Sequence, residues 1–229
     1  MKTIGLLGGM SWESTTGYYH TLNTVVKETL GGLYSARIIM YSVDFAELAD
    51  CLGKNDWNRI EDLLSDAAVK LAKAGADFLV IATNTMHQVA GAVQKAAGVP
   101  LIHIAEASAD ALLARGLKKV GLLGTKPTME MDFYRQKLEA KNIGVVTPAE
   151  DDREAMNRII FEELCRGIIS EKSRADGLAI MERLRNNGAE GMLLACTELG
   201  LLFRPQDTDL PLFDTAVIHA EAAAREALR

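Results

Sequence analysis

The feature that most constrains the fold of this chain is an internal duplication. Residues 75–85 (GADFLVIATNT) and residues 188–198 (GAEGMLLACTE) share one plan: Gly-Ala-acid, an apolar run, an alanine and a polar triplet. The two segments align without a gap, so that Thr83 is aligned with Cys196. A repeat of this length predicts two copies of one structural unit.

Two further pairs of segments support the duplication. Residues 4–9 (IGLLGG) resemble residues 120–125 (VGLLGT), and residues 99–103 (VPLIH) resemble residues 210–214 (LPLFD). All three pairs occur in the same order along the chain. Three ordered matches are hard to obtain by chance, so we interpret the chain as a duplicated unit.

Apolar runs typical of buried strands alternate with amphipathic stretches throughout the sequence. This alternation predicts parallel βαβ units and an α/β fold. We therefore expect two similar parallel-sheet α/β domains that face each other across a cleft. The first domain is predicted to comprise residues 1–104 and 215–229, and the second residues 105–214.

The predicted elements follow from hydrophobic periodicity and turn residues. Strands are expected at residues 3–7, 36–43, 77–82, 99–103, 118–123, 143–147, 192–195 and around Phe213. Helices are expected at residues 12–29, 58–74, 86–94, 105–115, 128–141, 153–165 and 171–186, after residue 198 and at the C-terminal end. Residues 44–58 are expected to form a surface loop that leads into a helix; the alternative is a segment that lies over the cleft at the strand ends.

Bulk composition excludes several functional classes. The net charge of −6, without a Lys/Arg cluster, gives no electrostatic footprint for nucleic acid. No apolar run approaches the ~20 residues needed to span a bilayer. The cysteines Cys51, Cys165 and Cys196 lack the spacing of a disulfide framework or a zinc site. We expect a cytoplasmic protein without secretory signal or metal site.

Cys196 ends a predicted buried strand, next to Thr197 and Glu198. In open α/β sheets, ligands bind at the carboxyl ends of strands, so this thiol is a candidate nucleophile or general base. A helix N-terminus beside it is expected to lower the thiol pKa towards neutrality. The alternative is a cysteine that merely packs in the core, which is common. His87 and His103 either reach the same cleft or are packed side chains.

The strand-to-helix junction at residues 8–11 (GGMS) is the other candidate binding segment. Glycines between a strand and a helix allow close approach of backbone to a ligand, and Ser11 is a good helix N-cap. The Gly-x-Gly-x-x-Gly fingerprint of dinucleotide sites is absent, which argues against a nucleotide cofactor.

Three motifs, at residues 8–11 (GGMS), 83–87 (TNTMH) and 196–198 (CTE), resemble the cofactor-independent aspartate/glutamate racemase family. The resemblance covers essentially the whole chain. It implies two similar α/β domains, a homodimer, an amino-acid substrate, and no need for pyridoxal phosphate or metal. In that family, two cysteines act on opposite faces of the substrate Cα, one removing the α-proton and the other returning a proton.

The resemblance also implies roles for individual residues. Cys196 corresponds to the cysteine that acts on the L-enantiomer, and Thr83 stands in place of the other cysteine. A threonine hydroxyl is a much weaker acid than a thiol and a poor base. Both residues are nevertheless predicted to be catalytic. The predicted substrate-binding residues are Met10, Ser11, Asn84, Thr85, Cys165, Thr197 and Glu198.

Specificity follows from one departure from the family pattern. Aspartate-specific members hold the side-chain carboxylate with a basic residue at the position where this chain has Cys165. We therefore expect broad specificity that includes neutral polar amino acids such as homoserine. The alternatives are a single-cysteine decarboxylase of substituted malonates, a more distant maleate isomerase or hydantoin racemase, and a non-catalytic amino-acid sensor.

Overall fold

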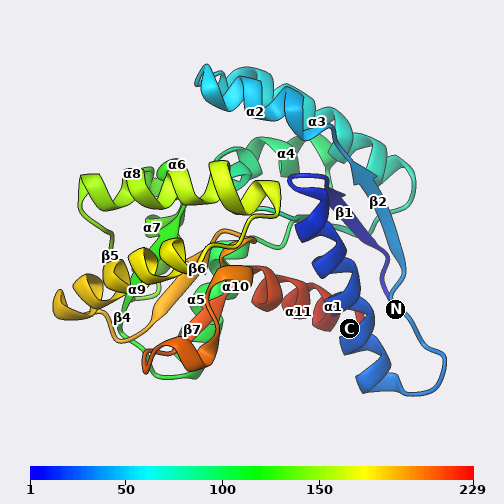
Figure 1. Cartoon of the computed structure of the whole chain (residues 1–229). Coiled ribbons are helices and arrows are strands. Elements are labelled where there is room, and N and C mark those ends of the chain that lie inside the picture. Colours follow the sequence, from blue (N-terminus) through cyan, green and yellow to red (C-terminus); the bar gives the residue numbers. More distant parts are fainter. The chain divides into compact units, whose positions relative to one another are not determined.

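The structure, a computed structural model, describes all residues 1–229. The chain divides into two compact units. Unit 1 comprises residues 1–104 and 219–229, and unit 2 comprises residues 105–218. Each unit contains one parallel sheet with helices packed against it (Figure 1). The predicted parallel α/β architecture is therefore confirmed.

Unit 1 contains a three-stranded sheet in the order β2-β1-β3. Its strands are β1 (Ile4–Gly8), β2 (Ile38–Ser42) and β3 (Phe78–Ile81). Its helical segments are α1 (Trp12–Leu30), α2 (Phe45–Gly53), α3 (Trp57–Lys73), η1 (Thr85–Val89) and α4 (Ala90–Ala97), together with most of α11 (Thr215–Ala227).

Unit 2 contains a four-stranded sheet in the order β5-β4-β6-β7. Its strands are β4 (Lys119–Gly124), β5 (Gly144–Val146), β6 (Met192–Ala195) and β7 (Leu212–Asp214). Its principal helices are α5 (Ile104–Ala114), α6 (Lys126–Glu130), α7 (Asp132–Glu139), α8 (Glu150–Arg158) and α9 (Glu171–Asn186). The shorter helical segments are η2 (Ile159–Glu163), η3 (Leu164–Arg166), α10 (Leu199–Leu202) and η4 (Pro205–Asp207).

The two sheets share one hydrogen-bond register. Gly5 of β1 pairs with Leu79 of β3, and Gly121 of β4 pairs with Met192 of β6, as the aligned repeats require. The Leu79 amide donates to the carbonyl of Pro100 at 2.8 Å, and the Met192 amide donates to that of Pro211, also at 2.8 Å. The duplication inferred from the sequence is thus matched by equivalent backbone hydrogen bonds in the two sheets.

The core of unit 1 follows from strand alternation and a helical stripe. Leu7, Leu79 and Ile81 point to the side of the sheet that α2, α3 and α4 cover. Helix α3 begins at the N-cap Asp56, whose carboxylate accepts from the Arg59 amide at 3.0 Å. It contributes an apolar stripe to this core, made of Ile60, Leu64, Ala67, Ala68 and Leu71.

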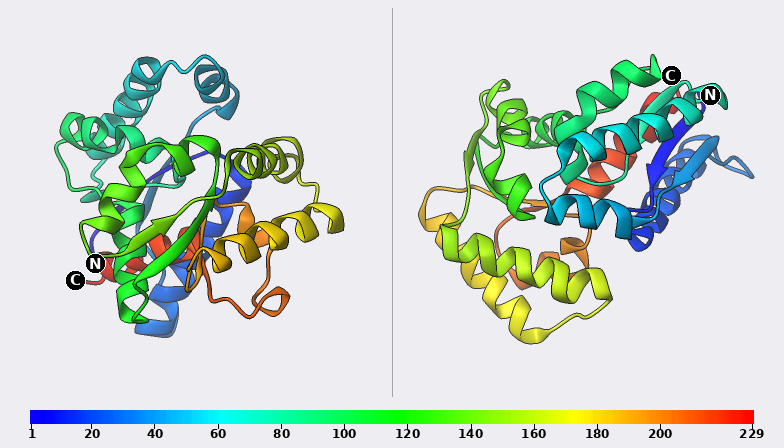
Figure 2. Two further views of the ribbon diagram at one scale, coloured as in Figure 1. Left: turned by 90° about the vertical axis from the view of Figure 1, so that its left-hand side faces the viewer. Right: turned by 90° about the horizontal axis from the view of Figure 1, so that it is seen from above.

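The core of unit 2 lies between its sheet and helices α8 and α9. Met192 and Leu194 point into it, together with Cys196 just beyond the strand. Helices α8 and α9 lie side by side in both views of Figure 2. The Arg183 guanidinium donates to the Asp152 carboxylate at 2.7 Å through two nitrogens and so joins these helices. Cys196 is therefore part of a well-packed hydrophobic core.

The prediction of a fourth strand at residues 99–103 was wrong. Only a single parallel bridge, between Leu79 and Leu101, is present there. Pro100 has no amide to donate, and the chain enters α5 at Ile104, so only Leu101 has ladder bonds on both sides.

Several helical segments also differ from prediction. Residues 44–58 contain α2, which begins at the N-cap Asp44 and buries Leu48 and Cys51. The helix predicted at 128–141 is two helices, since Met131 is extended between α6 and α7. The helix predicted at 153–165 begins earlier, at Glu150, and after Arg158 continues as the wider π-helix η2.

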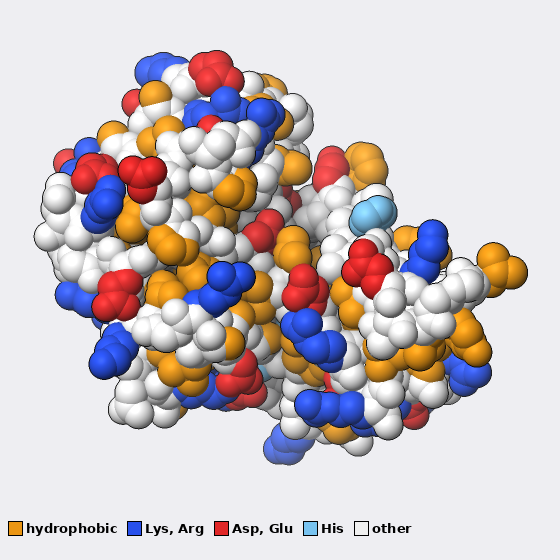
Figure 3. Space-filling model, turned by 90° about the horizontal axis from the view of Figure 1, so that it is seen from below, with side chains coloured by type: hydrophobic (Ala, Val, Ile, Leu, Met, Phe, Trp, Pro, Cys, Tyr) orange, Lys and Arg blue, Asp and Glu red, His pale blue; other side chains and the backbone are white.

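The surface is of mixed charge. Figure 3 shows basic and acidic side chains interspersed over one face, in line with the small net charge of −6. None of the helices has both the length and the apolar character that a membrane crossing requires.

Candidate active site

Each sheet has one point where the chain connections leave in opposite directions. In unit 1 this point lies between β1 and β3, and in unit 2 it lies between β4 and β6. Open α/β sheets bind ligands at the carboxyl ends of the strands at such a point. In unit 1 the segments there follow Gly8 and Ile81, and in unit 2 they follow Gly124 and Ala195.

In unit 2, Cys196 follows β6 directly and is only 7% exposed. Its thiol donates to Oε2 of Glu198 at 3.1 Å, and the Thr197 hydroxyl donates to the same oxygen at 2.7 Å. Glu198 is itself buried. One carboxylate thus holds both the predicted catalytic thiol and its neighbouring hydroxyl.

The expectation that the Cys196 thiol has a lowered pKa was wrong. Burial raises the pKa of Cys196 well above its ordinary value, and the nearby Glu198 carboxylate raises it further. The helix that follows is α10, which has only four residues and offers little dipole. At neutral pH the group is therefore a thiol with a carboxylate positioned to receive its proton.

Cys165 lies in η3, in the same unit as Cys196. It is half-buried and packs against the hydrophobic cluster that contains Cys196. Unit 2 therefore brings together four of the predicted residues, namely Cys165, Cys196, Thr197 and Glu198.

Two residues at this strand end were missed. Asp214 ends β7 and accepts from the Ala216 amide at 2.9 Å, while burial raises the pKa of its carboxyl and the nearby Glu198 raises it further. Thr125 follows β4 and is buried. The repeated segments at residues 120–125 and 210–214 carried the signal for both, since each repeat ends at one of these residues.

In unit 1, the predicted residues also gather at the strand ends. Thr83 follows β3 and is half-buried, and the buried Asn84 and Thr85 begin η1. Met10 and Ser11 follow the neighbouring strand β1 and are buried as well. Ser11 caps α1, its hydroxyl accepting from the Ser14 amide at 3.4 Å, as predicted.

His87 is a packed residue with a structural role. Its Nδ1 donates to the Thr83 carbonyl at 2.8 Å, and its Nε2 accepts from the Ile104 amide at 3.2 Å. Burial, with His103 and His219 nearby, lowers the pKa of His87 well below its ordinary value. The neutral ring therefore fixes the backbone at Thr83, and both of its nitrogens are occupied.

The glycines at the end of β1 and directly after it, Gly8 and Gly9, serve the protein's own packing. A Cβ on Gly8 would lie 2.4 Å from the Thr15 side chain. Gly9 has φ +91°, and a Cβ there would lie 2.4 Å from the Val43 carbonyl oxygen. The close approach expected here from the sequence is therefore made by the chain itself.

The model of the Asp/Glu/Hydantoin racemase family matches residues 7–223. The chain belongs to this family. A crystal structure of a proposed Asp/Glu racemase from Yersinia pestis is 52% identical, covers both chains completely and superposes with a TM-score of 0.93. The aspartate racemase homologue of Pyrococcus horikoshii OT3 is 38% identical, with complete coverage of both chains and a TM-score of 0.85.

A curated relative points the same way. The broad specificity amino-acid racemase RacX of Bacillus subtilis is 25% identical over 222 residues, which cover 96% of this chain and 95% of that protein. Family, relatives and structural neighbours agree that this member of the racemase family is an isomerase of the amino-acid racemase type.

Proposed function

We propose that this racemase inverts free amino acids without a cofactor, with Cys196 as the acid and base on the L-face and Thr83 as the proton-transferring group on the opposite face. The observation that carries this proposal is the hydrogen bond from the Cys196 thiol to the buried Glu198 carboxylate, at 3.1 Å. A thiol with a raised pKa becomes a strong base once its proton has moved to Glu198.

Thr83 has a different environment in its own unit. Its carbonyl is fixed by His87, and no protein group hydrogen-bonds its half-buried hydroxyl. A hydroxyl is a poor base, so we assign it proton delivery to the carbanion, with water as the ultimate source. Since the two enantiomers have equal free energy, kcat/KM must be equal in the two directions, and the weaker group limits both.

The remaining predicted residues are assigned to the substrate. Backbone and side-chain groups of Asn84, Thr85 and Thr197 are proposed to hold the α-carboxylate, and Met10 and Ser11 to form part of the floor. Cys165 is proposed to contact the substrate side chain. Because Cys165 offers no cationic side chain for a dicarboxylate substrate, we propose broad specificity that includes L-homoserine.

Exchange of the α-proton tests the assignment of Cys196. Single L-amino acids are incubated with the protein in D₂O, and loss of the Cα–H signal is followed together with chiral analysis. We expect exchange and D-isomer with the unaltered chain, and neither with Cys196→Ala. Cys51→Ala is a matched control, because Cys51 is equally buried, at 7% exposed, in the core of unit 1.

Other outcomes have definite meanings. Exchange without inversion would remove Thr83 from the mechanism, and no exchange with any amino acid would favour decarboxylation or ligand sensing. Kinetic constants for L-aspartate, L-glutamate and L-homoserine test specificity. A preference for aspartate by orders of magnitude would contradict the broad specificity proposed from Cys165.

We also infer a homodimer that forms through an apolar face of unit 1. Trp12, Tyr19 and Met40 are 67, 53 and 51% exposed and line one cavity of about 310 Å³. Exposed clusters of large apolar side chains mark contact surfaces. Light scattering is expected to give twice the 24.9 kDa chain mass, and Trp12→Arg is expected to give monomer. A monomeric unaltered chain would contradict the inference.

A further inference from the structure

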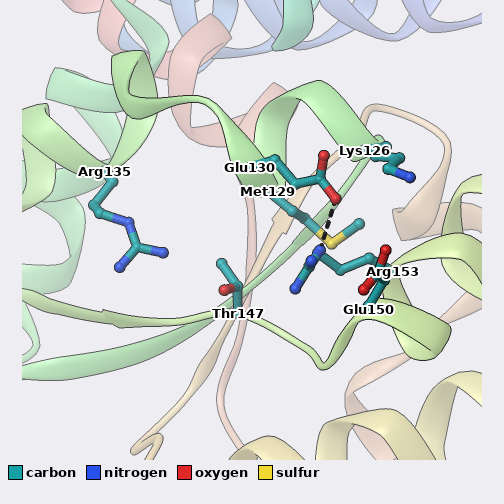
Figure 4. Close-up of a pocket in the computed structure, with 7 residues that line it drawn as sticks. All are labelled: Lys126, Met129, Glu130, Arg135, Thr147, Glu150 and Arg153. Carbon is teal, nitrogen blue, oxygen red and sulfur yellow. Dashed lines mark hydrogen bonds and ion pairs between the residues drawn. The ribbon is translucent and has the colours of Figure 1, made fainter.

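Unit 2 contains a cavity of about 500 Å³ whose wall includes none of the residues assigned above to the racemase reaction. It lies at the carboxyl ends of β4 and β5, bounded by α6, α7 and the start of α8 (Figure 4). Charged side chains supply most of its wall, and Thr147 and Met129 complete it.

Two of the cations in this wall are neutralised. The Arg153 Nε donates to Oε1 of Glu130 at 2.9 Å, and its Nη1 donates to the Pro148 carbonyl at 2.7 Å. Lys126 forms an ion pair with Glu154 at 3.3 Å. These groups build the wall and leave little net charge of their own.

Arg135 and Glu150 differ from the other charged groups, because neither forms an ion pair or side-chain hydrogen bond. They extend from different elements, Arg135 from α7 and Glu150 from the first turn of α8. In Figure 4 the two lie on opposite sides of the Thr147 hydroxyl. The cavity therefore presents a free guanidinium and a free carboxylate that are separated from each other.

The fold does not require these charges. The corresponding cavity of unit 1 lies between α1 and β2, and it has no charged wall residue. The alignment that pairs Gly8 with Gly124 places Tyr19 at the position of Arg135, and the strand register places Met40 at that of Thr147. Duplication alone therefore explains the cavity and not its charges.

We propose that this cavity is a second, non-catalytic site that binds a free α-amino acid as its zwitterion. The carboxylate of the ligand would bind the Arg135 guanidinium, which offers paired donors in a fixed plane. The ammonium group would bind the Glu150 carboxylate, and the Thr147 hydroxyl would hydrogen-bond between them. The assignment comes from the two opposite charges and does not depend on the chemistry at Cys196.

Glycine is a suitable probe, because it is the smallest zwitterion and has no enantiomer to interconvert. Binding is followed on the full ¹⁵N-labelled chain through the backbone amide signals of Thr147 and Glu150. We expect these signals to shift and saturate with glycine. Acetate and methylammonium, which each carry only one of the charges, are expected to bind at least about tenfold more weakly.

Matched variants assign the effect to the two side chains. Arg135→Ala and Glu150→Gln are each expected to weaken glycine binding at this site about tenfold or more. Arg115→Ala and Glu139→Gln, which alter exposed charges outside the cavity, are expected to leave it unchanged. The amide spectrum of each variant, recorded without glycine, also tests whether that variant remains folded.

Several results would overturn the proposal. One is the absence of saturable shifts at Thr147 and Glu150. Another is acetate binding as tight as that of glycine, which would make the site a simple anion site. A third is unchanged glycine binding in Arg135→Ala, which would remove Arg135 from the site. Loss of α-proton exchange in Cys196→Ala bears on the racemase mechanism alone, so the two hypotheses fail separately.

Discussion

Units 1 and 2 have the same strand register but present different chemistry at the same point. After β6 the chain reads Cys196, Thr197, Glu198, and after β3 it reads Thr83, Asn84, Thr85. In unit 2 the Cys196 thiol donates a hydrogen bond to a carboxylate. In unit 1 the residue at this position is Thr83, whose backbone carbonyl is hydrogen-bonded by a neutral histidine. The comparison teaches that the side chains at a strand end can change while the backbone register stays the same.

The largest expected effect comes from placing a threonine after β6, as already stands after β3. Cys196→Thr removes the thiol that donates to Glu198 and should lower kcat/KM by roughly 10³-fold or more in both directions, the scale of losing a general acid–base. Initial rates from each enantiomer, resolved by chiral chromatography, measure the loss. Retention of a tenth of the activity would show that Cys196 is not the base.

Acid should destabilise the chain through the histidines of unit 1. Burial lowers the pKa of His219 to about 4, while an unfolded histidine titrates near 6.5. The unfolded state therefore binds more protons between these values, and the free energy of unfolding should fall by about 3 kcal/mol as pH drops from 6.5 to 4.

Urea unfolding at several pH values measures this slope. His219→Gln should be less stable at pH 7, since the ring accepts from Tyr18 Oη at 2.9 Å and donates to the Ile102 carbonyl at 2.8 Å. Its slope with pH should nevertheless be shallower. The exposed His20→Gln is the control, and equal slopes in both variants would refute the assignment to His219.

The converse substitution, Thr83→Cys, places a thiol after β3, as already stands after β6. Thr83→Cys should raise kcat/KM about tenfold, and by the same factor in both directions, because a thiol is a better acid and base than a hydroxyl. Rates from L- and D-enantiomers check this result. An unchanged rate would mean that proton transfer at Thr83 is not limiting.

The smallest effect is expected from Glu198→Gln. Removal of this carboxylate removes one of the causes that raise the pKa of Cys196, although burial, the larger cause, remains. Alkylation of the Cys196 peptide by iodoacetamide should therefore begin at lower pH, and this shift should be small because burial remains. Alkylation that begins at higher pH than in the unaltered chain would contradict this role of Glu198.

Much of the fold could be predicted, because the repeat and the hydrophobic periodicity are local properties of the sequence. The strand before Cys196 and the helix at residues 171–186 were predicted with the observed bounds. The strand predicted at residues 99–103 does not form, because Pro100 has no amide to donate and α5 begins at Ile104, which leaves only Leu101 paired with β3. Helix α2 was missed although six of its nine residues are apolar, because Gly53 and the polar residues within 44–58 favoured a loop.

The site shows the same limit. The residues at both strand ends could be named from their position after apolar runs, since parallel strands end at one edge of a sheet. The pKa of Cys196 could not, because it depends on burial and on the rotamer that turns Glu198 towards the sulfur. The hydrogen bonding of His87 likewise depends on the amide of Ile104, which lies 17 residues further along the chain and beyond α4.

Unit 1 is assembled from chain segments on either side of unit 2, and this has a consequence for biosynthesis. The Lys2 amide donates to the Ala227 carbonyl at 2.8 Å, and Ala220, Ala223 and Ala224 are completely buried. Residues 219–229 leave the ribosome after all of unit 2. During translation, unit 2 can therefore fold first, and unit 1 can complete its core only after residues 219–229 have been synthesised.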